Sequence, residues 1–122
     1  MNTNENIDIN EEEVIAAKME AKNSPDVFTI NFKTPIPYNE KEYASLTFDF
    51  GSLTGNDDLA IEDELAALNV MLVTPAFSGH YLIRMAAKAC KEPIGCDFLR
   101  ALNLKEYSKI RSAARSFLLK AE

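Results

Sequence analysis

The sequence contains few of the side chains that build zinc and redox sites. It has two cysteines, Cys90 and Cys96, and a single histidine, His80. A structural zinc site usually takes four such ligands, so we expect no metal site of this kind. The cysteines leave two interpretations open, a redox pair or small buried apolar side chains with free thiols. The reducing compartment expected below favours free thiols.

Long apolar runs and an excess of basic residues are also missing. The longest apolar stretch, residues 70–73 with short extensions, is far below the roughly 20 residues of a membrane-spanning helix. Thirteen Lys and Arg against nineteen Asp and Glu give a net charge of −6. This is the wrong sign for binding to nucleic acid or to an anionic bilayer. Residues 1–10 lack the basic and apolar regions of a secretory signal. We therefore expect a cytoplasmic protein with no nucleic-acid and no membrane partner.

The motifs of common enzyme classes are missing as well. Residues 77–81 lack the Gly-x-Ser-x-Gly nucleophile elbow, and the glycines of residues 51–55 do not lead into the Lys-Ser/Thr of a phosphate-binding loop. Ser78 fits better as a helix N-cap, with His80 exposed in the first turn. The alternative, an enzyme that uses His80 with nearby Cys90, has no activating partner in the sequence. We predict no enzymatic activity, no catalytic residues and no cofactor.

Five carboxylates are crowded into a short segment. They are Asp57, Asp58, Glu62, Asp63 and Glu64. The segment lacks the alternating ligands, central glycine and terminal glutamate of an EF-hand loop. Carboxylates near a helix N-terminus are stabilised by the helix dipole by about 0.3–1 kcal/mol each, and those further along face solvent. We favour this helical interpretation over a cation site.

Alternating apolar residues predict a β-hairpin after an acidic arm. Residues 1–26 are expected to form a flexible or partly helical arm, with a helix-prone stretch at residues 11–22. Two alternating runs follow, separated by turn formers at residues 34–42. Their inward faces are Phe28, Ile30 and Phe32, and Ala44, Leu46, Phe48 and Phe50, with Tyr43 on the opposite face. An isolated hairpin is marginal in water, so its aromatic face must pack on helices.

Helical patterns fill the remaining chain. The first helix is capped by Asn56 or Asp57, and the next runs from Ser78 to about residue 91 with Arg84 facing away from the core. A short helix has Pro93 in its first turn, and Asn103-Leu-Lys-Glu106 caps the last one. We predict an α+β fold, an N-terminal β-hairpin packed on a C-terminal bundle of about four short helices. Residues 27–122 form this single domain.

Charge is divided unevenly along the chain. Residues 1–64 carry four Lys and fifteen Asp or Glu, a net charge of −11, whereas residues 65–122 carry nine Lys or Arg and four Asp or Glu, a net charge of +5. Such an asymmetry suits head-to-tail self-association or an acidic partner.

The order of these features resembles the small tail assembly chaperones of tailed bacteriophages, in particular the group named after the Mu-like tail assembly proteins. The likeness extends over residues 27–119. The matching features are residues 28–32, Pro35-Ile36, Tyr43-Ala-Ser-Leu46, Thr54-Gly-Asn-Asp57-Asp-Leu59, and Phe98-Leu99 through Phe117-Leu118. The chain differs from the group at residues 49–53, where members usually carry a basic residue and a proline.

The resemblance implies a non-enzymatic protein of the host bacterial cytoplasm that is absent from the mature virion. Its partners are then the tape measure protein and the tail tube protein, and it works as a homo-oligomer. The alternative is a structural tail or head-completion protein that stays in the virion. For protein binding we expect residues of the last helix, because three consecutive apolar residues cannot all face one core. These candidates are Tyr107, Ile110, Ala114, Phe117, Leu118 and Leu119.

Overall fold

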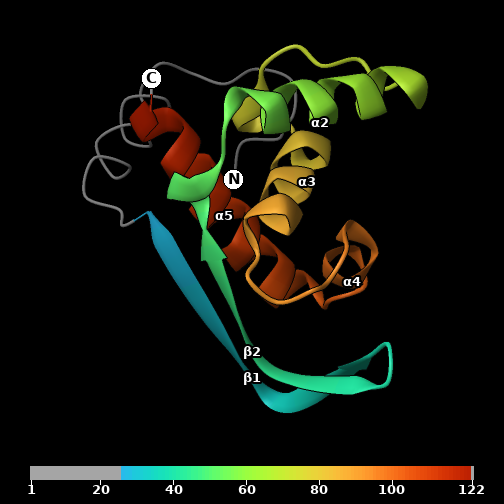
Figure 1. The fold of residues 1–122 in the computed structure, drawn as a ribbon, viewed down its shortest axis with the longest axis vertical. Coiled ribbons are helices and arrows are strands. Elements are labelled where there is room, and N and C mark those ends of the chain that lie inside the picture. Colours follow the sequence, from blue (N-terminus) through green and yellow to red (C-terminus); the bar gives the residue numbers. More distant parts are fainter. Residues whose placement is uncertain (1–25, 122) are drawn as a thin grey trace, which may run out of the picture.

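A computed structural model describes residues 26–121, and it places a two-stranded hairpin against a group of helices (Figure 1). The elements in order are β1 (Val27–Tyr38), β2 (Lys41–Asp49), the 3-10 turn η1 (Phe50–Ser52), α2 (Gly55–Ala67), the 3-10 turn η2 (Pro75–Phe77), α3 (Gly79–Ala89), α4 (Cys96–Arg100) and α5 (Leu104–Ala121). The α+β prediction, a hairpin followed by four helices, is confirmed. The predicted helix at residues 11–22 lies outside the described residues.

The hairpin turn is tighter than the sequence predicted. Strand β1 continues to Tyr38, which pairs with Lys41 of the antiparallel strand β2. The turn therefore consists of Asn39 and Glu40 alone, with φ angles of 49° and 67°. Positive φ at both central residues is the requirement of a type I′ turn, whose twist matches that of the strands. The prediction of a broad turn over residues 34–42 is wrong because most of that segment lies in β1.

The strand pairing is irregular in the middle of the hairpin. Four residues of β1, 32–35, face Ala44 alone. Pro35 lies in this segment, and proline has no N–H to donate to the ladder. The irregularity also changes which side chains face inward. Tyr43, predicted on the outer face, packs against Phe98 with ring centroids 6.0 Å apart, and Ala44, predicted inward, is exposed.

The segment after α3 covers part of the outer edge of β2. Cys90 forms an isolated antiparallel bridge with Phe48. The Lys91 N–H donates to the Thr47 carbonyl at 2.8 Å, and the Thr47 N–H donates to Glu92 Oε1 at 2.8 Å. These bonds satisfy backbone groups that an edge strand otherwise leaves open, and they join the hairpin to the helices.

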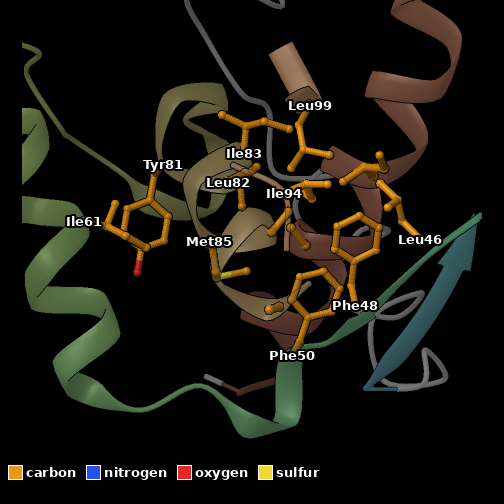
Figure 2. Close-up of a cluster of buried hydrophobic side chains, with 14 of the residues drawn as sticks. Leu46, Phe48, Phe50, Ile61, Tyr81, Leu82, Ile83, Met85, Ile94 and Leu99 are labelled. Carbon is orange, nitrogen blue, oxygen red and sulfur yellow. The ribbon is translucent and has the colours of Figure 1, made fainter. Parts of the chain in front are cut away.

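Helix α3 lies at the centre of the core (Figure 2). Residues 81–86 are all buried, because β2, α2, α4 and α5 contact this helix from different sides. On the hairpin side, the rings of Phe48 and Phe50 stack with centroids 6.1 Å apart. On the other side, α2 buries Ile61 and Leu65. An aromatic hairpin face packed on a central helix is the arrangement that the alternating pattern required.

Two helix starts agree with the sequence analysis. Ser78 Oγ accepts a hydrogen bond from the Tyr81 N–H at 3.3 Å at the beginning of α3. Asn103 Oδ1 accepts one from the Glu106 N–H at 3.1 Å at the beginning of α5. Each side chain satisfies a backbone donor that has no partner within the helix.

The other two helix starts differ from the prediction. The N-cap of α2 is Thr54 rather than Asn56 or Asp57, and the Thr54 N–H donates to Asp57 Oδ2 at 2.8 Å in a capping box. Helix α4 begins at Cys96 with Gly95 as N-cap, so Pro93 precedes the helix instead of lying in its first turn. Several turn formers in succession allow more than one start, and packing selects between them.

Candidate protein-binding surface

Three of the five carboxylates of α2 have structural partners. Asp57 completes the capping box, Asp58 accepts a hydrogen bond from the Tyr81 hydroxyl, and Glu64 pairs with Arg84. Burial, together with the Asp58 carboxylate, raises the pKa of Tyr81 well above its usual value. Among residues 26–121, no three His, Cys, Asp or Glu side chains are grouped to hold a metal ion. The acidic cluster therefore belongs to a helix, as predicted, and two of its carboxylates, Asp58 and Glu64, also bind side chains of α3.

Arg84 is buried, whereas the sequence predicted that it faces solvent. The residue is 7% exposed and forms an ion pair with Glu64, whose side chain is 52% exposed. Its Nη1 donates to the His80 carbonyl at 3.0 Å. The prediction is wrong because α2 covers this side of α3 and supplies the carboxylate that makes burial of the guanidinium tolerable.

The thiols and the histidine show no arrangement for nucleophilic chemistry. Cys90 and Cys96 are both free, as predicted. Burial raises the pKa of the Cys90 thiol to about 12 and raises the pKa of the Cys96 thiol as well, so both are protonated at neutral pH and weakly nucleophilic. His80 is exposed at the start of α3, as the capping interpretation required.

The apolar residues of α5 serve the core. Ile110 and Ala114 are fully buried, and Tyr107 and Leu118 are half-buried against it. Phe117 stacks on Phe50 with ring centroids 5.7 Å apart.

The expectation that residues 117–119 leave an exposed apolar remainder is wrong for Leu119. Its side chain is 6% exposed and packs with Ala76 of η2, with Phe77 and Leu118 beside them. Helix α5 is covered on two sides, by the main core and by η2, so apolar residues on more than one face are buried. A charged residue at this position is therefore expected to destabilise the fold, which makes it unsuitable as a probe of partner binding.

The two most exposed large apolar side chains among the described residues, Met71 and Val73, lie between α2 and η2. Leu68 is 56% exposed, Met71 85% and Val73 82%, while Val70 and Leu72 alternate with them and pack against the core. Single exposed apolar residues are common, but a cluster of them typically marks an interaction site. Residues 70–73 are also the longest apolar stretch of the sequence, but no motif there predicted a role for them. We call residues 68–73 the apolar segment.

An open pocket of about 620 Å³ lies beside the apolar segment. It is lined by Leu68, Val70, Gly79, His80, Ile83, Arg84, Arg100 and Tyr107. Aliphatic residues thus share the lining with two arginines, a histidine and a tyrosine, and of the two arginines Arg84 is already paired with Glu64. This combination suits a ligand that offers both apolar groups and negative charge, such as an acidic stretch of polypeptide.

No helix within residues 26–121 is long and apolar enough to cross a membrane. The features described so far, the apolar segment and the pocket beside it, are typical of binding to another polypeptide. In comparisons with models of known families, with characterised proteins and with solved structures, nothing matches this chain.

Proposed function

We propose that this protein is a non-enzymatic tail assembly chaperone of a tailed bacteriophage. Its partners are the tape measure protein and the tail tube protein, and it acts as a homo-oligomer in the cytoplasm of the host bacterium without remaining in the mature virion. The resemblance of residues 27–119 to that group motivates the choice of partners. The structural observation that supports protein binding is the exposed apolar segment, residues 68–73.

The mechanism that follows is the temporary covering of apolar surface on a long client. Met71 and Val73 present apolar groups to solvent, and Leu68 and Val70 of the same segment line a pocket that also contains arginines. The unbranched, polarisable side chain of methionine adapts to varied apolar partners. A client held by such contacts remains soluble until tube subunits displace the chaperone.

The test of the function is a pull-down of the tagged protein from cells that produce phage particles, followed by mass spectrometry. We expect a very long, helix-rich protein in the eluate and no bait in purified particles. Bait present in particles at a fixed stoichiometry would contradict the chaperone proposal and would favour the structural tail or head-completion protein.

The test of the surface compares Met71→Asp with Leu104→Asp. Both side chains are highly exposed, at 85% and 74%, but Leu104 lies at the beginning of α5 rather than in the apolar segment. Burying an aliphatic side chain contributes about 1.5–3 kcal/mol, which corresponds to about 10- to 150-fold in affinity, so we expect Met71→Asp to weaken client capture at least about tenfold. Leu104→Asp is the control and should retain capture. Equal capture by both variants and the parent protein would exclude the apolar segment as the binding surface.

A further inference from the structure

A strip of arginines extends from the pocket along α5. Arg100 lines the pocket, the Arg111 guanidinium lies over the Tyr107 ring at 5.7 Å from its centroid, and that of Arg115 lies over the Phe77 ring at 5.8 Å. Positions 107, 111 and 115 share one face of the helix because they are four residues apart. Within residues 26–121, none of these three arginines forms a salt bridge. We call Arg100, Arg111 and Arg115 the basic strip.

The N-terminal part of the same chain has complementary chemistry. Residues 1–25 contain two Lys and six Asp or Glu, a net charge of −4. Four of these carboxylates fall within residues 11–20, at Glu11, Glu12, Glu13 and Glu20, interleaved with Val14, Ile15 and Met19. Carboxylates suit the basic strip, and the apolar side chains suit the aliphatic lining that Leu68, Val70 and Ile83 provide in the pocket.

The point where this segment joins the domain is close enough to the strip. Asp26 is tied to the last turn of α5 by an ion pair with Lys120, and its carbonyl accepts a hydrogen bond from the Phe50 N–H at 2.9 Å. Tyr107 precedes Lys120 by thirteen residues in α5, which corresponds to about 20 Å along the helix axis. Lys120 lies about 180° around α5 from Arg111, so the segment must also pass round the helix. The thirteen residues from Asp26 back to Glu13 span roughly 43 Å when extended, about twice the axial distance, which leaves enough length for this.

We propose that residues 11–20 dock in cis on the basic strip and insert apolar side chains into the pocket. Covalent attachment favours the chain's own segment, because a short tether gives an effective concentration in the millimolar range. The contact does not depend on which partner the protein serves.

The test uses NMR amide spectra of the full chain and two reciprocal sets of variants. The triple variant Glu11→Gln, Glu12→Gln, Glu13→Gln should shift the amides of Gly79, His80 and Arg111, more than 60 residues away in the sequence. The control carries Glu5→Gln and Asp8→Asn, which remove charge from the same region outside residues 11–20, and it should leave those amides unchanged. In about 0.5 M NaCl the difference between the parent and the triple variant should fall to less than half, because the Debye length drops to roughly 4 Å.

The reciprocal comparison uses Arg111→Gln and Lys109→Gln. Both remove one positive charge from α5, but positions 109 and 111 are about 200° apart around the helix. Arg111→Gln should shift the amides of residues 11–15, and Lys109→Gln should not. Shifts confined to the neighbours of each substitution would overturn the proposal. Long-range shifts that grow with protein concentration would also overturn it, since they would assign the contact to a second copy of the chain.

Discussion

Replacing Leu119 with alanine tests whether the last turn of α5 belongs to the core. The substitution removes three carbons from a side chain that is 6% exposed and packs with Ala76, Phe77 and Leu118. At about 0.8 kcal/mol for each buried carbon, the lost transfer free energy is about 2.4 kcal/mol. Leucine-to-alanine changes in closed cores cost about 2–5 kcal/mol, and the end of a helix relaxes more easily than its middle. We therefore expect the free energy of unfolding to fall by about 2–3 kcal/mol.

The matched control is Leu104→Ala at the other end of the same helix. Leu104 is 74% exposed, so its truncation should change the free energy of unfolding by no more than about 0.5 kcal/mol. Both variants make the same chemical change in α5, so the difference between them reports burial rather than helix propensity.

Urea unfolding followed by far-UV circular dichroism measures both values, since the chain has no tryptophan for fluorescence. With an m-value of about 1.5 kcal/mol/M, the expected loss lowers the midpoint of Leu119→Ala by about 1.3–2 M. The m-value itself should stay constant. If the two variants had the same midpoint, Leu119 would not be packed against η2, and the reasoning that places it in the core would be refuted.

Three further outcomes are expected from single contacts. Glu64→Gln leaves the buried guanidinium of Arg84 without its carboxylate and should lower the free energy of unfolding in urea by about 1–2 kcal/mol. The value is modest because the Glu64 side chain is half exposed. Glu62→Gln on the same helix is the control, and equal losses in the two variants would contradict the prediction. Glu40→Gly should stabilise the protein by about 0.5–1 kcal/mol, because Glu40 has a φ of 67° and glycine adopts positive φ without steric cost; a destabilised variant would argue against the two-residue turn. Burial raises the pKa of Cys90 from 9.0 to about 12, so the unfolded chain releases this proton at a lower pH than the folded chain does. The free energy of unfolding therefore declines as the pH rises between these two values, and the decline should be less steep in Cys90→Ala than in the parent protein. Identical slopes would contradict the raised pKa.

Local sequence patterns determined which elements form. Alternating apolar residues before and after the turn predicted two paired strands, and Ser78 and Asn103 marked the beginnings of two helices. These signals are local because a strand face and an N-cap depend on residues within a few positions. The tight turn escaped prediction, since neither Asn39 nor Glu40 is the glycine that usually reveals positive φ.

Tertiary structure alone decided which faces of those elements are covered. Periodicity shows that residues share a face, but the partner of that face comes from a distant part of the chain. Helix α2 supplies Glu64 and so buries Arg84, and η2 supplies Ala76 and so buries Leu119. Met71 and Val73 are at least as apolar as many core residues, yet nothing described in residues 26–121 covers their side chains, which are more than 80% exposed. Burial is a property of the pair of surfaces in contact, and the sequence of one segment specifies only one of the two.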